Sequence, residues 1–232
     1  MNLLSCLLMA FALVGAADDQ LEKPPVLEGF TLEHNIGKDN LPVEGKTFEA
    51  AGWVESDFDG KGEVKVENGT AILGKGNDMT GIRWTGPLAK MNYEISLEAK
   101  RVEGSDFFCG LTFPYGDDPC SFIVGGWGGT VVGISSLDYQ DAYNNETCQF
   151  KKFEPNKWYT IRVRVTPNYI QAWIDDDQLV KVKTTGREIG IRSEVEKSRP
   201  LGIATWRTTG AIRNVDLNVY TKPPEEPKDE EE

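Results

Sequence analysis

The sequence predicts an all-β protein that folds as an antiparallel β-sandwich. Short runs of the chain alternate apolar and polar residues, as strands with one buried face do. Turn residues, such as the pairs Asn-Gly and Asp-Asp, separate these runs. We find no convincing amphipathic helix between them, and 232 residues are enough for one domain with a substantial core.

The first 17 residues predict a signal peptide. An apolar segment of secretory length ends in Gly15, Ala16 and Ala17, and two aspartates follow. The segment is too short to span a membrane. We therefore expect a secreted or periplasmic protein without a membrane span, in which residues 18–25 form a linker.

The exported protein should begin at Ala17 or Asp18, because cleavage follows small residues of this kind. N-terminal sequencing of the purified secreted protein measures the start directly. A chain that still begins at Met1 would contradict the prediction.

The expected strands belong to one domain, residues 26–221, with no internal repeat. Residues 92–101 show the pattern clearly, because tyrosine, isoleucine, leucine and alanine alternate there with polar residues. An early hairpin turns at the Asn-Gly pair. In chain order, the expected strands lie within residues 62–73, 92–101, 122–132, 157–165, 169–175, 178–183, 200–206 and 211–220.

The charge of the chain argues against several kinds of partner. The formal net charge is −12, and an acidic surface repels the phosphates of nucleic acids and of anionic lipids. Residues 222–232 are rich in proline and glutamate and have little to bury, so we expect a disordered acidic tail.

Three cysteines follow the leader, and an oxidising compartment allows one disulfide among them. Cys109 lies in an apolar row and is expected to be buried. We expect Cys120 and Cys148 to form the disulfide, because they bracket the glycine-rich region. His34 is the only histidine, and no Cys/His cluster exists, so we expect no metal site and no Ser-His-Asp triad.

We also expect no cofactor. The glycine-rich segment lacks the helix that a phosphate-binding loop requires directly after its glycines, because the residues that follow read as a strand.

Three segments of the chain resemble known jelly-roll proteins. Residues 156–180, NKWYTIRVRVTPNYIQAWIDDDQLV, are similar to the Trp-led hairpin of concanavalin A-like and laminin G-like jelly rolls. Residues 93–113, YEISLEAKRVEGSDFFCGLTF, and residues 200–217, PLGIATWRTTGAIRNVDL, resemble the 3-keto-disaccharide hydrolase domain of exported bacterial proteins. The resemblance covers most of residues 45–220. It implies a concanavalin A-like jelly roll that hydrolyses 3-keto-glycosides or 3-keto-disaccharides.

Trp127 is unusual because four glycines flank it. Glycines beside an aromatic residue on a strand leave its ring open to a ligand. The C–H patches of a sugar ring lie well on such a face. Trp127 is therefore either a platform for a carbohydrate ligand or a core residue at a bulged strand that the glycines allow to bend.

Two further groups of polar and aromatic residues are candidates for a carbohydrate site. The loop of residues 135–148 is dense in hydrogen-bonding side chains and is either part of a site or a plain surface loop. Arg162 and Trp173 share an outward face, where they form either a cation–π pair or part of a groove. The carbohydrate-binding candidates are Trp127, Asp138, Tyr139, Asn145, Glu146, Arg162, Trp173 and Arg187.

Three functions remain open. A 3-keto group acidifies the neighbouring C–H, so a base and an acid suffice to eliminate the aglycone of the glycoside that the family resemblance implies. The catalytic candidates are Glu98, Asp106 and Asp141, with Arg162 or Arg187 polarising the ketone. The alternatives are a non-catalytic, lectin-like carbohydrate-binding domain and a structural or adhesive module.

Overall fold

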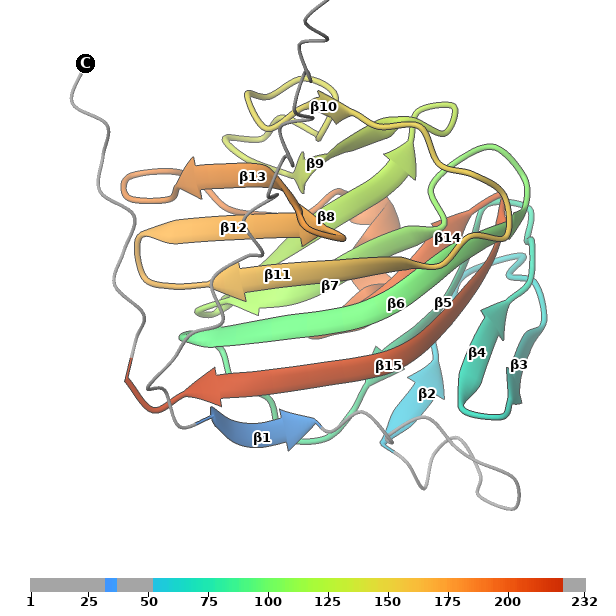
Figure 1. Ribbon diagram of the computed structural model, residues 1–232, viewed down its shortest axis with the longest axis horizontal. Helices are drawn as coiled ribbons and strands as arrows, with labels where there is room; N and C mark the ends of the chain where they lie inside the picture. The colour runs from blue at the N-terminus through green and yellow to red at the C-terminus, as the bar shows by residue number, and fades with distance from the viewer. Residues whose placement is uncertain (1–31, 37–51, 223–232) are drawn as a thin grey trace, which may run out of the picture.

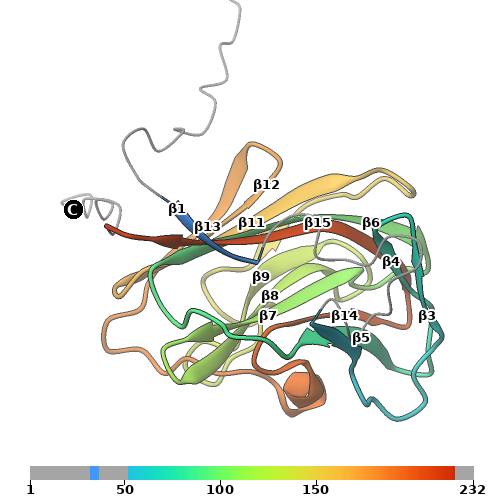
Figure 2. The ribbon, with the colours of Figure 1, turned by 90° about the horizontal axis from the view of Figure 1, so that it is seen from below.

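The computed structural model describes residues 32–36 and 52–222, and it shows two antiparallel sheets stacked face to face (Figures 1 and 2). The larger sheet has the strand order β13–β12–β11–β6–β15–β4–β3, and β1 also pairs with β15. The smaller sheet has the order β10–β9–β8–β7–β14–β5–β2. The predicted antiparallel jelly-roll sandwich is thereby confirmed.

Both sheets combine runs of consecutive antiparallel strands with pairings between strands that are distant in sequence. The strands of the larger sheet are β1 (Leu32–Ile36), β3 (Val64–Glu67), β4 (Thr70–Leu73), β6 (Tyr93–Glu103), β11 (Tyr159–Val165), β12 (Tyr169–Ile174), β13 (Asp177–Lys183) and β15 (Thr209–Tyr220). Those of the smaller sheet are β2 (Trp53–Glu55), β5 (Met79–Trp84), β7 (Cys109–Tyr115), β8 (Asp118–Gly126), β9 (Val131–Ser135), β10 (Gln149–Phe150) and β14 (Gly202–Trp206). A short 3₁₀ helix, η2 (Ser193–Ser198), precedes β14.

The main core lies between the two sheets. On β6, Tyr93, Ile95 and Leu97 are buried, whereas the residues between them are half-exposed on the outer face. This is the alternation expected of a strand with one face in the core.

The smaller sheet is buried on both faces. Ile123 and Val131 point away from the main core and belong to a second apolar cluster on the outer face, together with Phe107 and Val195 of η2. Double burial explains why β8 and β9 read as nearly continuous apolar runs. It also gives the outer face of this sheet an apolar base on which a site can be built.

Trp127 lies in a turn and not on a strand. The predicted strand over residues 122–132 is divided, because β8 ends at Gly126 and β9 begins at Val131. Trp127 itself has a φ of 48° in this turn. A reversal of this kind aims the indole ring outward from the end of the hairpin.

The predicted disulfide between Cys120 and Cys148 is wrong. Cys120 is fully buried in the core between the sheets, opposite Phe113 on β7. Cys148 follows the loop on the outer side of the smaller sheet and packs against the second cluster there. The sheet therefore separates the two thiols, and both are free, as is the buried Cys109. The expected burial of Cys109 is confirmed.

Several predictions fall outside the described residues. These are the signal peptide of residues 1–17, the linker of residues 18–25, the start of the domain at residue 26, and the acidic tail beyond residue 222. Within the described part of the chain, no helix has the length and apolar character needed to cross a membrane.

Candidate functional site

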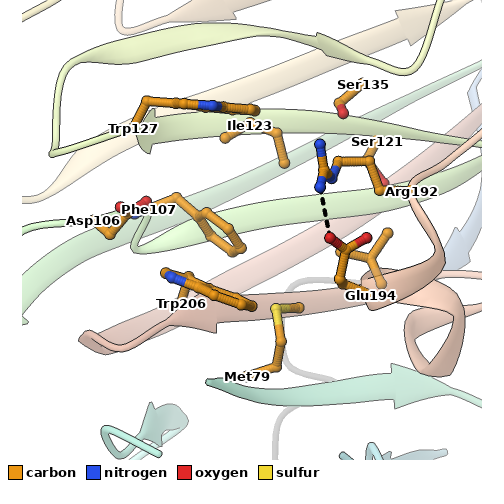
Figure 3. A pocket seen from close by; sticks show the side chains of 11 residues that line it. Met79, Asp106, Phe107, Ser121, Ile123, Trp127, Ser135, Arg192, Glu194 and Trp206 are labelled. Atoms are coloured by element: carbon orange, nitrogen blue, oxygen red, sulfur yellow. Dashed lines mark hydrogen bonds and ion pairs between the residues drawn. The ribbon is translucent and has the colours of Figure 1, made fainter. Parts of the chain in front are cut away.

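A pocket of about 220 Å³ lies on the outer face of the smaller sheet (Figure 3). We call it the tryptophan pocket, because two tryptophans are among the residues that line it. Its apolar lining consists of Met79, Phe107, Ile123, Trp127, Val195 and Trp206. Its polar lining consists of Asp106, Ser121, Ser135, Arg192 and Glu194.

The two tryptophans come from different parts of the sheet. Figure 3 shows Trp127 and Trp206 on two sides of Phe107, with the Arg192–Glu194 pair at the other end of the pocket. Trp127 is 40% exposed, so it does not fill core space. The interpretation of Trp127 as a core residue is therefore wrong, and its ring is open to a ligand on the pocket side.

The glycines around Trp127 allow a buried arginine to approach the backbone. Arg101, on β6, is 8% exposed, and its Nη2 donates to the carbonyls of Gly125 at 3.3 Å and Gly129 at 2.9 Å. A Cβ on Gly125 would lie only 2.6 Å from this nitrogen. Burial lowers the pKa of Arg101, and the nearby carboxylate of Asp106 partly opposes that shift. The positively charged side chain of Arg101 thus stabilises the backbone around Trp127 by hydrogen bonds to carbonyls on both sides of it.

Asp106 holds the same turn from its other side. Its Oδ2 accepts the N–H of Gly128 at 3.2 Å, and its Oδ1 accepts the N–H of Phe107 at 2.8 Å. Because both oxygens are hydrogen-bonded, the carboxylate is fixed beside the ring of Trp127. Lone pairs remain on each oxygen for a ligand hydroxyl or a proton.

Arg192 connects the pocket with the loop above it. Its Nη2 donates to Glu194 Oε1 at 2.6 Å, and its Nη1 donates to Asp141 Oδ2 at 2.9 Å. The hydrogen bond from Arg192 lowers the pKa of Glu194, so this carboxylate is ionised at neutral pH. Asp141 supports Arg192 and does not itself line the pocket.

Ser135 presents a polar group at the base of the pocket. Its side chain is 2% exposed, and its hydroxyl has no hydrogen-bond partner among the described residues. A buried hydroxyl without a partner is costly, and a ligand hydroxyl would satisfy it. The adjacent Ser121 already bonds to Thr112 across β7 and β8, at 2.9 Å.

The polar side chains of the loop of residues 135–148, predicted as part of the site, mostly form hydrogen bonds within the loop and with Arg187. Arg187 donates to Asp138 Oδ2 and to Glu146 Oε1, each at 2.6 Å. The side-chain amide of Asn145 donates to three backbone carbonyls, and its oxygen accepts from Thr147. None of these predicted candidates lines the tryptophan pocket, nor does Tyr139, whose side chain is 86% exposed.

The ion pairs of Arg187 should stabilise this loop fully above about pH 4 and progressively less as the pH falls below that value. The pKa of Asp138 is lowered by the N–H of Glu188 and by Arg187, and that of Glu146 by Arg187. A lowered folded pKa contributes stability that is present above the unfolded values of roughly 4 and is lost as the pH falls through the folded value.

Arg187→Met should therefore speed hydrogen exchange across residues 136–148 at pH 7, compared with the wild type. The difference should shrink as the pH falls below about 4, the ordinary pKa of these carboxyl groups, because protonation then progressively removes the same ion pairs from the wild type. A difference that stays constant down to pH 2.5 would show that the aliphatic part of Arg187, and not its charge, holds the loop.

Three predicted site residues lie on the other side of the sandwich. Glu98 lies on the outer face of the larger sheet, where it accepts hydrogen bonds from Arg213 and Asn214. Arg162 and Trp173 are on that same face, with the guanidinium carbon 4.3 Å from the ring centroid. The fold therefore does not bring these three residues together with Asp106 and Trp127.

Sequence reasoning missed most of the pocket. Trp206 is the last residue of the strand predicted within residues 200–206, and nothing in the sequence marks it as a site residue. Its place beside Phe107 follows from the pairing between β14 and β7. Arg192 and Glu194 lie in a stretch that has neither helical nor strand periodicity. Within the described ranges, no group of three His, Cys, Asp or Glu side chains is placed to hold a metal ion.

The chain matches a family model, and its structure matches those of known proteins. A family model, described as the 3-keto-alpha-glucoside-1,2-lyase-like domain, matches residues 40–218. None of the curated protein sequences matches the chain.

Several solved structures share the fold at low sequence identity. The carbohydrate-binding module CBM66 from Bacillus subtilis has 11% identity and a TM-score of 0.51, covering 72% of this chain and 94% of that chain. The potassium-bound carbohydrate recognition domain of Emp46p has 14% identity and a TM-score of 0.53, covering 80% and 98%. The apo Crh5 transglycosylase has 13% identity and a TM-score of 0.54, covering 82% and 89%.

Proposed function

The chain belongs to the 3-keto-alpha-glucoside-1,2-lyase-like domain family, and we propose that it binds a 3-keto-glycoside in the tryptophan pocket and eliminates the aglycone. The observation that carries the proposal is the composition of this one pocket. It combines two tryptophans with two carboxylates and an arginine. Aromatic faces suit the C–H surface of a sugar, and the charged groups suit its hydroxyls and its ketone.

The size of the pocket suits one sugar ring. Its volume of about 220 Å³ is below the roughly 300–1,000 Å³ of pockets that enclose drug-sized ligands. The 3-keto ring would lie between Trp127 and Trp206, and the unpartnered hydroxyl of Ser135 would bond to one of its hydroxyls.

Elimination requires a base near C2 and a positive charge near the C3 ketone. We assign the base to Asp106, which takes the proton from C2 and leaves an enolate whose negative charge lies on the ketone oxygen. The enolate then reforms the ketone while the C1–C2 double bond forms and the C1–O bond breaks. The aglycone leaves as an alcohol with a proton from solvent. Arg192, held by Glu194 and Asp141, stabilises the negative charge that develops on the ketone oxygen.

A lectin-like function is the second candidate. Two structures that share the fold are, by their titles, a carbohydrate-binding module and a carbohydrate recognition domain. Such a function would use the same pocket and the same stacking, without proton transfer by Asp106. Export to the periplasm or the medium fits either function.

The deciding experiment incubates the protein with a 3-keto-disaccharide and measures both binding and released monosaccharide. We expect release from the wild type, and a loss of at least about 100-fold in rate for Asp106→Asn with binding retained. Glu67→Gln, an exposed carboxylate on β3, serves as the matched control and should keep the wild-type rate. Binding without release would support the lectin-like function, and the absence of both would contradict the proposal.

A further inference from the structure

Three exposed aromatic rings form a continuous row that begins at the tryptophan pocket. Tyr143 stacks near Trp127, with ring centroids 6.3 Å apart and an interplanar angle of 23°. Phe150 meets Tyr143 edge-on at 6.4 Å and 87°. We call Trp127, Tyr143 and Phe150 the aromatic strip.

The exposure of these rings is unusual for this molecule. Among the described residues, only five large hydrophobic side chains are exposed, and three of them form the strip. Trp127 is 40% exposed, Tyr143 51% and Phe150 70%. Single exposed aromatic residues are common, but a contiguous set that adjoins a pocket marks a surface for a ligand.

The strip lies on the same face of the smaller sheet as the pocket. Phe150, on β10, is the cross-strand partner of Val131 on β9. Val131 is buried in the outer cluster, and directly opposed residues share a face. Since β10 is the edge strand of the sheet, the strip runs from the pocket to the edge of the molecule.

The size of the pocket leaves most of a longer ligand outside it. A volume of about 220 Å³ accommodates one sugar ring, so further units of a glycan would lie on the adjoining surface. Trp127 belongs to both the pocket and the strip and so connects the two. Asn144, which is exposed beside Tyr143, adds an amide for hydroxyl groups.

We propose that the aromatic strip binds the glycan chain that extends from the sugar in the pocket, so that the ligand is an oligosaccharide of three or more units. This inference rests on the proposed saccharide site. Each ring offers an apolar face to the C–H side of one sugar, while the hydroxyls of that sugar remain in water.

A protein partner fits the strip less well. The three rings are turned by 23° and 87° relative to one another and do not form one flat apolar face. A stable protein interface also buries about 800 Å² on each partner, far more than three side chains provide. A flexible sugar chain adapts to rings that face in different directions.

The test measures how affinity depends on chain length. The probes are maltose, maltotriose and maltotetraose, each oxidised to a ketone at C3 of the non-reducing-end glucose. Binding is followed at short times by quenching of tryptophan fluorescence. We expect affinity to rise by roughly tenfold from the disaccharide to the tetrasaccharide.

Variants then locate the source of that gain. Tyr143→Ala and Phe150→Ala should each reduce this gain, whereas Tyr143→Phe should retain it. Phe150→Ala, at the far end of the aromatic strip, should leave the affinity for the disaccharide unchanged. Because both side chains are more than half exposed, these variants should melt close to the wild type. Trp158→Ala, on the opposite sheet face beside Arg213, is the matched control and should retain the gain.

Each outcome separates this inference from the proposed function. Equal affinity for all three chain lengths, or a gain that survives both alanine substitutions, would overturn the inference and leave the saccharide pocket intact. Failure to bind any of the three probes would overturn the proposed pocket and, with it, the inference.

Discussion

Replacing Trp127 with alanine should lower saccharide affinity by about 30-fold to 1,000-fold and leave the fold nearly as stable as the wild type. A central aromatic residue in a binding site is worth about 2–4 kcal/mol of binding free energy. The indole ring is 40% exposed and lies outside the core, and surface changes cost about 0.5 kcal/mol or less. Thermal melting and a binding titration on the same protein measure the two effects.

Trp53→Ala provides the contrast. Trp53 is fully buried, and its ring meets Trp84 edge-on at 5.5 Å. This substitution should cost roughly 3–5 kcal/mol of folding free energy. If Trp127→Ala instead melted as early as Trp53→Ala while its folded fraction bound saccharide normally, Trp127 would have a structural role and no binding role.

Gly125→Ala should destabilise the protein by about 3 kcal/mol. Gly125 has a φ of 77°, where an L side chain costs about 1–2 kcal/mol. The new Cβ would also lie 2.6 Å from Arg101 Nη2 and 3.1 Å from the ring of Phe108. Crowding of a well-packed site adds about 1–3 kcal/mol. For a domain of this size, the melting temperature should fall by roughly 6–12 °C.

Gly128→Ala, in the turn that follows β8, is the matched control. Gly128 has a φ of 86°, but a Cβ there would meet nothing within 4 Å. It should therefore show only the backbone cost of about 1–2 kcal/mol. Equal destabilisation by the two substitutions would show that the contact with Arg101 contributes nothing to the rigidity of the turn.

The fold was predictable because the strands obey simple periodicity. β6 and β11 are predicted correctly because buried and more exposed residues alternate along them. The turn at Trp127 was read as strand, because β8 and β9 are apolar on both faces and leave no polar break between them. The cysteine pairing failed for a related reason, since spacing along the chain does not show on which face of a sheet a thiol lies.

The candidate site was predictable only in part. Asp106 and Trp127 are the two predicted residues that line the pocket. The four glycines that flank Trp127 are the signal for that residue, whereas Asp106 is a candidate because acid-base elimination needs a carboxyl group. Arg192 and Glu194 reach the pocket from a segment without periodicity, and only tertiary packing places them there. The outward rows of the larger sheet look equally suitable in sequence, and sequence cannot tell which sheet carries the site.

Residues 136–148 and 186–198 form a layer on the outer face of the smaller sheet, and several contacts join these two segments to each other. Arg187 and Arg192 each join its two segments, and backbone hydrogen bonds link Ser136 with Gly190 and Asp138 with Glu188. The strand pairings beneath depend on none of these contacts. Substitutions in this layer can therefore reshape one wall of the pocket without breaking a strand pairing of the sandwich.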